Sequence, residues 1–248
     1  MSYEKFAYLY DQLMIDAPYE EWVSFVLKMI EMNNVDCKKL LDVGCGTGNI
    51  AIPLNKQGIS VTAVDLSEEM LLVAQQKSER EDAKVRFFQQ DMRHLESLGL
   101  YNVVISLCDT INYLADEAEV ASTFQGIFEH LDKSGMFIFD VHTPYKINKI
   151  FNGSTYAYNG EEISYIWECF QGEESNSVEH DLSFFVQTDE GVYERFDELH
   201  KQRTYSLTFY KNALEESGFE IISITSDFST DTFNENDERW FFVAKKLN

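Results

Sequence analysis

Three glycines at alternate positions, in the stretch LLDVGCGTG (residues 40–48), indicate a backbone that a ligand approaches closely. Gly44 permits a tight turn, Gly46 lets a ligand reach the main chain, and Gly48 lets a following helix pack closely. The free N–H groups at the start of such a helix bind a carboxylate or a phosphate. Asp65 follows 21 positions after Gly44, near the separation of about 20 at which an acidic residue binds ribose hydroxyls. The pattern predicts a nucleoside-binding site, with a plain tight turn and an N-capping aspartate as the structural alternative.

The spacing of the glycines separates the kinds of nucleotide site. A dinucleotide-binding loop reads G-x-G-x-x-G, whereas here Gly48 comes one position earlier. The Lys-Ser/Thr pair that completes a Walker-type phosphate loop does not follow. The spacing G-x-G-x-G therefore disfavours a nicotinamide dehydrogenase and excludes a Walker-type loop.

Alternating strands and helices must position this loop. The stretch KLLDV predicts a strand before the glycines, and residues 49–58 predict a helix after them. Further strands are expected at residues 59–67, 84–91, 101–107 and 136–142, with helices at 68–80 and 117–131. Such alternation is typical of βαβ units and a parallel sheet.

The pattern changes between residues 151 and 204, where four strand-like stretches follow one another and a hairpin is expected around Gly191. A helix at 206–217 and strands at 220–228 and 239–247 then resume the first pattern. We therefore expect an N-terminal helical lid (1–36), a main domain (37–150 and 205–248) and an antiparallel β cap inserted into it (151–204).

The glycine motif and its surroundings resemble the class I methyltransferases that use S-adenosylmethionine. D-x-G-C-G-T-G matches the first motif of that family, QQDM its adenine-contacting element, and LEESGFEI with RWFFVAKK its last helix and strands. The resemblance covers about residues 38–140 and 205–246. It implies a Rossmann-like α/β fold, with a mostly parallel seven-stranded sheet whose last strand is antiparallel.

The resemblance also implies roles for individual residues. The loop backbone would hold the methionine part of S-adenosylmethionine, Asp42 would lie near its ammonium, and Asp65 would hold the ribose. Asp91 would accept from the adenine amino group, while Leu66 and Met92 would contact the ring. The cofactor-binding residues expected on this basis are Tyr10, Asp42, Gly44, Cys45, Gly46, Gly48, Asp65, Leu66, Asp91, Met92 and Leu107.

The N-terminal and inserted segments also have counterparts in that family. FAYLYDQLM resembles the lid of many small-molecule members, and Tyr10 is the tyrosine expected to reach the cofactor. By its position, the insertion resembles the extra sheet of small-molecule N-methyltransferases, which covers the acceptor or pairs subunits. Its aromatic residues are expected to wall an acceptor pocket, to pack on the core or to contact a second subunit; they include Tyr156, Tyr158, Tyr165 and Trp167.

Residues that act on a methyl acceptor are expected where the parallel strands end. His142 is the preferred general base, because an imidazole titrates near pH ~6.5, and Tyr113 is the second catalytic candidate. Each has a structural alternative, as a hydrogen-bonded or packed side chain. The other candidates are Asp109, Asn112, Tyr145, His180 and His200.

Composition limits the partners. The formal net charge of the 248-residue chain is −23, so it lacks the cation surplus that nucleic acid or an anionic membrane requires. Cys37, Cys45, Cys108 and Cys169 form no C-x-x-C pair, and neither a zinc site nor any other metal site is expected. We expect a soluble, cytoplasmic protein without a membrane span, with a homodimer through the β cap as one possibility.

The sequence thus predicts an enzyme that transfers a methyl group from S-adenosylmethionine to nitrogen or oxygen of a small molecule. Two alternatives remain at this stage. One is a methyltransferase acting on RNA or protein, and the other is a non-catalytic nucleoside-binding protein with the same fold.

Overall fold

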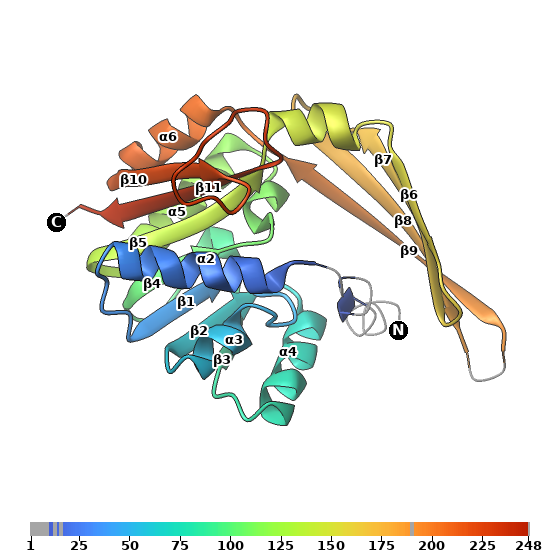
Figure 1. The fold of residues 1–248 in the computed structure, drawn as a ribbon, viewed down its shortest axis with the longest axis horizontal. Helices are drawn as coiled ribbons and strands as arrows, with labels where there is room; N and C mark the ends of the chain where they lie inside the picture. The colour runs from blue at the N-terminus through green and yellow to red at the C-terminus, as the bar shows by residue number, and fades with distance from the viewer. Residues whose placement is uncertain (1–9, 12–13, 15–16, 189–190, 248) are drawn as a thin grey trace.

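A computed structural model describes residues 10–11, 14, 17–188 and 191–247 of the chain. Within them the strands form two separate sheets, one of seven strands and one of four. Helices flank the larger sheet, and the smaller sheet extends from it as an arm (Figure 1). Of the expected lid, the described part comprises Tyr10, Asp11, Met14 and the residues from Ala17 onward.

The larger sheet has the strand order β10-β11-β5-β4-β1-β2-β3. Strands β1 to β5 run parallel, and β11 lies antiparallel between β5 and β10. This arrangement confirms the predicted fold class, including the antiparallel last strand. The bounds are β1 (Lys39–Val43), β2 (Ser60–Asp65), β3 (Arg86–Gln89), β4 (Tyr101–Ser106), β5 (Leu131–His142), β10 (Phe219–Ser226) and β11 (Arg239–Lys246).

Capping residues mark the ends of several helices. Ser67 accepts a hydrogen bond from the Met70 backbone N–H at the start of α4, and Ser206 accepts one from Phe209 at the start of α6. Gly218 follows α6 with a φ of +94°, a backbone conformation that glycine adopts readily. The helices are α2 (Tyr19–Met32), α3 (Ala51–Lys56), α4 (Glu68–Arg80), α5 (Glu117–Glu129) and α6 (Leu207–Glu216), with short turns η1 (Met92–His94), η2 (Thr110–Tyr113) and η3 (Lys146–Phe151).

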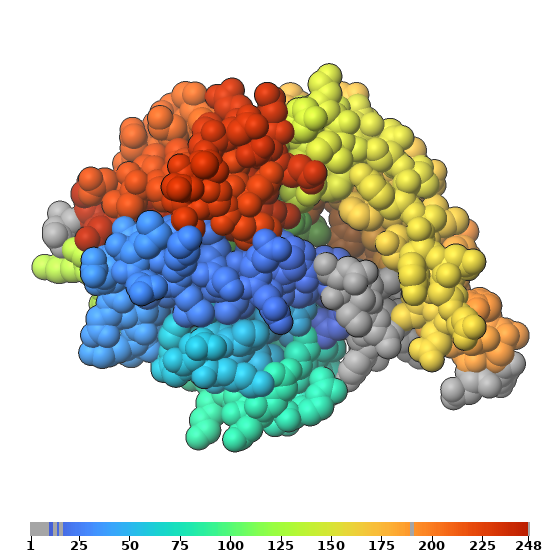
Figure 2. Space-filling model, viewed as in Figure 1, coloured from blue at the N-terminus to red at the C-terminus, as the bar shows by residue number. Residues whose placement is uncertain are grey.

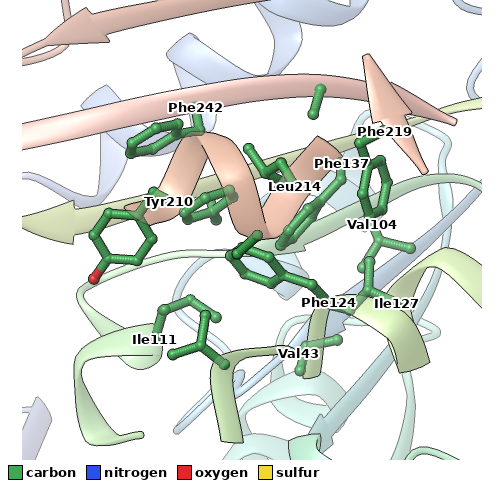
Figure 3. Packing of buried hydrophobic residues seen from close by; sticks show 14 of the residues in the cluster. Val43, Val104, Ile111, Phe124, Ile127, Phe137, Tyr210, Leu214, Phe219 and Phe242 are labelled. Atoms are coloured by element: carbon green, nitrogen blue, oxygen red, sulfur yellow. The ribbon is translucent and has the colours of Figure 1, made fainter. Parts of the chain in front are cut away.

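The core lies on both faces of the large sheet. Successive strand residues alternate between the faces, so Leu40 packs with α2 and α3 while Leu41 packs with α5 and α6. Figure 3 shows the second face, where Phe124 of α5 and Tyr210 of α6 meet Phe137 and Phe242 of the sheet. Both faces are thus buried, which explains why the central strands are almost wholly apolar.

Strand β5 is longer than predicted. It begins at Leu131, five positions before the expected start at Met136, and α5 ends at Glu129. The early start reflects the pairing of Leu131 with Tyr101, after which the register shifts before Val103 pairs with Met136. This irregularity depends on contact with β4, so the local apolar pattern did not reveal it.

The cap is an antiparallel meander, as the sequence predicted. Its strands are β6 (Thr155–Asn159), β7 (Ile163–Gln171), β8 (Ser177–Gln187) and β9 (Tyr193–Arg203), paired in chain order. The β8–β9 pairing runs from Ser177↔Arg203 to Gln187↔Tyr193, consistent with the hairpin expected around Gly191. Figure 2 shows the cap, in yellow and orange, reaching beyond the body of the molecule.

None of the described helices is both long and apolar enough to cross a bilayer.

Candidate active site

A cavity of about 1170 Å³ lies at the carboxyl ends of β1, β2 and β4. Strand β1 is flanked by β4 on one side and β2 on the other, which is the point where ligands bind in open parallel sheets. The wall includes most residues predicted from the sequence, namely Tyr10, Asp42, Gly44, Cys45, Gly46, Asp65, Leu66, Asp91, Met92, Leu107 and Tyr113. Gly48 and His142 are not among the lining residues.

The three glycines of the loop differ in what surrounds them. A Cβ at Gly44 would lie 2.1 Å from Thr110 Cγ2, and one at Gly48 would lie 3.2 Å from Ile52 Cδ1. A Cβ at Gly46 would meet no other atom within 4 Å. Gly44 and Gly48 therefore serve packing within the protein, whereas Gly46 leaves open space beside the loop.

Asp42 is a buried carboxyl on the cavity wall. Its side chain is 2% exposed, and Oδ2 has no hydrogen-bond partner among the described residues. Burial, with a smaller contribution from Asp65, raises its pKa to about 8. An unpaired buried carboxyl of this kind favours a cationic ligand group.

Asp65 braces the glycine loop from the end of β2. Its Oδ2 accepts from the Gly46 backbone N–H at 2.7 Å, and its Oδ1 accepts from that of Ser67 at 2.9 Å. Burial raises its pKa, and these hydrogen bonds oppose that shift. Each carboxylate oxygen has two lone pairs, so Asp65 retains capacity to accept from a ligand donor.

The predicted adenine-binding end includes an arginine that the sequence reasoning missed. Arg93 Nε and Nη2 both donate to Asp91, at distances down to 2.6 Å, and Nη1 donates to Glu119. The Arg93 hydrogen bonds lower the pKa of Asp91. Leu66 is 62% exposed on the same wall, an apolar surface suited to a flat ring. The sequence signal for this contact was the position of Arg93, two residues after the aspartate of QQDM.

The described N-terminal residues are fixed to the glycine loop by a buried lysine. Lys77 Nζ of α4 lies 2.5 Å from Asp11 Oδ2 and donates to Asn49 Oδ1 at 2.6 Å. Asp11 Oδ1 also accepts from Thr47 Oγ1 at 2.6 Å. This network keeps the neighbouring Tyr10 at the cavity wall, where the sequence placed it.

Beyond the glycine loop, the cavity continues to residues from β4, η2 and the cap. Asp109, Tyr113 and His200 line this end, and the Tyr113 hydroxyl lies 3.2 Å from His200 Nδ1. Burial lowers the pKa of His200, and Asp109 opposes the shift. His200 belongs to β9, so the cap contributes a titratable side chain to the cavity. We refer to Asp109, Tyr113 and His200 as the acceptor end.

His142 lies one layer behind this wall. Its side chain is 5% exposed, its Nε2 is 3.5 Å from Asp109 Oδ2, and its ring packs edge-on against Phe151 of η3. Burial lowers its pKa to about 4, although Asp109 opposes the shift. This placement argues against the predicted direct role as a base, because Asp109 stands between His142 and the cavity.

A buried ion-pair network supports the acceptor end. Arg239 of β11 donates to Asp140 of β5 and, through Nη2 at 3.0 Å, to Asp109. Asp140 also accepts from the Cys108 backbone N–H at 2.8 Å and from Trp22 Nε1 at 3.2 Å. The network therefore ties together α2, β5, β11 and the loop after β4.

This network keeps Asp109 ionised. Burial alone would raise its pKa, but His142, Arg239 and Gln202 outweigh that effect and hold the pKa well below its usual range. The acceptor end therefore carries a fixed negative charge beside two neutral hydrogen-bonding side chains.

The described residues offer no metal site. Within that part of the chain, no group of three or more His, Cys, Asp or Glu is arranged to hold an ion. The four cysteines are free thiols.

Comparison with known proteins defines the class to which this fold and site belong. Residues 40–135 match the family described as methyltransferase domain. A protein of Geobacillus sp. (strain WCH70), named "Putative methyltransferase GWCH70_2453", is 49% identical over 247 residues, covering 99% of this chain and 100% of the relative. The chain therefore belongs to the methyltransferase family.

Solved structures specify the cofactor class. An S-adenosylmethionine-dependent methyltransferase from Clostridium acetobutylicum ATCC 824 has a TM-score of 0.89 and 30% identity, with 100% of both chains covered. The sugar N-methyltransferase KedS8 from Streptoalloteichus sp ATCC 53650 has a TM-score of 0.80 and 20% identity, covering 97% of this chain and 93% of KedS8. The protein is an S-adenosylmethionine-dependent methyltransferase of class I, as the glycine spacing and QQDM predicted.

The cavity suits that cofactor. Asp42 lines the cavity and has a carboxylate oxygen without a partner among the described residues, which suits an ammonium, and Gly46 leaves room against the loop backbone. Asp65 has lone pairs for ribose hydroxyls, and exposed Leu66 offers an apolar surface for the base.

Proposed function

We propose that the protein transfers the methyl group of S-adenosylmethionine to a nitrogen or oxygen atom of a small molecule that binds at the acceptor end. The observation that carries this proposal is a single cavity in which the predicted cofactor residues continue into Asp109, Tyr113 and His200. The solved structure of KedS8, which has a similar fold and is named as a sugar N-methyltransferase, supports a small acceptor.

The chain's task in this reaction is positioning. S-adenosylmethionine, when bound, supplies a methyl group already activated on a sulfonium. Asp42 would hold the ammonium, Asp65 the ribose hydroxyls, and Leu66 with Met92 would contact the adenine. Holding an acceptor atom in line with the methyl carbon can lower the barrier by about 7–11 kcal/mol.

The acceptor end would orient the nucleophile and remove its proton. Asp109 stays ionised and can accept a hydrogen bond from an amine or hydroxyl group. The lowered pKa of His200 favours the neutral imidazole, which, with the Tyr113 hydroxyl, can take up the proton that the acceptor loses.

The acceptor is best identified by mass spectrometry. A metabolite extract is incubated with the protein and S-adenosylmethionine carrying an isotopically labelled methyl group, alongside samples of RNA and of protein. We expect label in a small molecule. Label only in RNA or protein would replace the proposal with that alternative, and cofactor binding without label in any pool would favour a non-catalytic role. Pairing of two copies through the cap stays a prediction, which sedimentation would test.

We expect Asp65→Ala to remove most of the increase in melting temperature that S-adenosylhomocysteine produces. A ligand at 100 times its Kd stabilises a protein by about 2.7 kcal/mol, and the variant loses both the ribose contact and the brace on Gly46. Asp116→Ala is the control, because Asp116 is an N-capping aspartate that is not itself among the residues lining the cavity. If both variants lost the ligand-induced increase in melting temperature equally, Asp65 would have only a structural role in the loop. Stabilisation of the wild type by NAD instead would contradict the cofactor site.

Gly46→Ala should weaken S-adenosylhomocysteine binding at least tenfold, because the new methyl group occupies the open space beside the loop. The positive φ of +52° adds a folding cost of about 1–2 kcal/mol. Gly58→Ala is the matched control, since Gly58 also has a positive φ (+88°) and an open Cβ position. Calorimetric titration and thermal melting separate the effects: both variants lose stability, and only Gly46→Ala loses affinity. Equal affinities would show that the ligand does not approach Gly46.

A further inference from the structure

Gln202 connects the cap to the acceptor end. It lies in β9 with its side chain 4% exposed, and its Nε2 donates to Asp109 Oδ2 at 2.7 Å. Its Oε1 lies 3.2 Å from Nε2 of His180, which belongs to β8. Gln202 itself is not among the residues that line the cavity.

The direction of these hydrogen bonds follows from chemistry. The indole N–H of Trp167 is only a donor, and it lies 3.0 Å from His180 Nδ1. His180 Nδ1 therefore accepts, and in the neutral ring Nε2 carries the proton and donates to the Gln202 amide oxygen. The Gln202 NH₂ group then points to Asp109. Burial lowers the pKa of His180 to about 4, which keeps the ring neutral at neutral pH.

Asp109 is a residue that needs such support. Both Cys108 and Asp109 have positive φ, +57° and +54°, a conformation that disfavours side chains other than glycine. The Asp140 carboxylate holds their backbone N–H groups, and Arg239 holds Asp109 Oδ1. Gln202 adds a donor to the other carboxylate oxygen, and this donor comes from the cap.

We propose that Gln202 is a positioning residue: the chain of hydrogen bonds Trp167–His180–Gln202–Asp109 lets the cap sheet orient the Asp109 carboxylate for the methyl acceptor. This inference rests on the proposed function. We call this chain of hydrogen bonds the relay. Because the relay ends at Asp109 and not at the glycine loop, the cap should affect the methyl-transfer step and not the affinity for the cofactor.

Two substitutions at Gln202 separate the links of the relay. Gln202→Met keeps the length of the side chain and removes its hydrogen bonds to His180 and Asp109, together with the one to Tyr113. Gln202→Glu keeps an acceptor for His180 but brings a second carboxylate against Asp109. Gln171→Met is the matched control, because Gln171 is an exposed glutamine of the same sheet.

The first measurement is nuclear magnetic resonance of the histidine rings at pH 7. We expect wild-type His180 as the Nε2–H tautomer, with a slowly exchanging ring proton. That proton signal should persist in Gln202→Glu and vanish in Gln202→Met. A wild-type ring protonated on Nδ1 or on both nitrogens, or an unchanged signal in Gln202→Met, would overturn the relay.

The second measurement is the rate of labelled methyl transfer to the metabolite extract. We expect Gln202→Met to reduce the rate at least tenfold, with S-adenosylhomocysteine affinity within threefold of wild type and Gln171→Met unchanged. An equal loss of affinity, or a Gln202→Met rate like that of Gln171→Met, would refute a positioning role.

The pH profile gives a rescue that a merely structural residue would not show. The charged or titratable groups around this position are Asp109, Tyr113, His142, Lys146, Cys169, His180, His200 and Arg239. In Gln202→Glu, protonation of the new carboxyl restores a donor to Asp109, so its rate relative to wild type should rise between pH 8 and pH 6. A flat or falling ratio would contradict the relay. If the wild type transfers no label, the proposed function fails, and the ring-proton measurement alone then decides whether the relay exists.

Discussion

Asp42→Asn is expected to abolish the thermal stabilisation by S-adenosylhomocysteine while making the ligand-free protein more stable at pH 8.5. The two effects have one cause. Asp42 is buried, one of its oxygens lacks a partner among the described residues, and its pKa is raised to about 8. The carboxylate therefore destabilises the empty protein and binds a cation strongly.

The sign for stability follows from linkage. A carboxyl whose pKa is higher in the folded protein than its unfolded value of about 3.9 contributes stability at low pH, and this contribution is lost as pH rises to about 8. Asparagine cannot ionise, so it avoids the loss. We expect Asp42→Asn to increase the free energy of unfolding by about 2 kcal/mol at pH 8.5 and to change it little near pH 4. The full pKa shift would correspond to ~1.4 kcal/mol per pKa unit, but relaxation of the protein and entry of water reduce its effect.

Ligand affinity should show the opposite pH dependence. In the wild type, binding of the ligand's ammonium requires ionised Asp42, so affinity should rise up to tenfold per pH unit between pH 6 and pH 8. Calorimetric titration in buffers of different ionisation enthalpy should detect release of a proton on binding. Asp42→Asn should bind at least 100-fold more weakly, since removing one partner of a buried charge pair costs about 3–5 kcal/mol.

Asp181→Asn is the control for these measurements. Asp181 is an exposed aspartate of the cap, so the same change there should alter neither the melting temperature nor the affinity. If Asp42→Asn bound S-adenosylhomocysteine as tightly as the control, Asp42 would not be the ammonium site. If it lowered the stability of the ligand-free protein at pH 8.5, the charged carboxylate would not be the destabilising group.

The structure brings most of the residues predicted for the cofactor to one cavity, but fewer of those predicted for the acceptor, and the reason is the length of chain involved. The loop Gly44–Gly48 and the strand that ends at Asp65 are contiguous elements, each with its own local pattern. Because parallel strands end at one edge of a sheet, their residues come together whenever the order of elements is right. That part of the prediction needed no knowledge of long-range pairing.

The acceptor end depends on contacts between distant segments. Asp140 and Arg239 are 99 positions apart, and Asp109 and Gln202 are 93 positions apart. His142 looked suitable because it ends a strand, but nothing local shows that it lies behind Asp109. His200 lines the cavity because the end of β9 lies against η2, a contact that alternation within β9 does not encode.

One signal for the buried network was present in the sequence. Asp140 stands alone in the apolar strand MFIFDVH, and Arg239 opens the apolar strand RWFFVAKK. Both strands are rich in large apolar residues, and a buried charge is rarely tolerated without a partner. Two opposite charges in two buried strands therefore indicated a pair, although not its position beside the cavity.

Arg239→Met should be among the most destabilising single substitutions in the body of the protein. Arg239 donates to both Asp140 and Asp109, and its guanidinium lies 5.0 Å from the centre of the Trp22 ring. Asp140 is fully buried and also accepts from Cys108 and Trp22, so it cannot turn toward water. Leaving buried carboxylates without their cation costs about 3–5 kcal/mol, which urea unfolding at pH 8 should show.

The pH dependence and two further variants identify electrostatics as the cause. Without Arg239 the folded-state pKa values of Asp140 and Asp109 rise, so the deficit relative to wild type should be smaller at pH 5.5 than at pH 8. Arg239→Lys keeps the charge and should recover part of the loss, although an ammonium cannot span two carboxylates as a guanidinium does. Arg195→Met removes an exposed ion pair with Asp197 and should cost at most about 1 kcal/mol. A deficit that is equal at both pH values, or no smaller in Arg239→Lys than in Arg239→Met, would mean that lost packing is responsible and not an uncompensated charge.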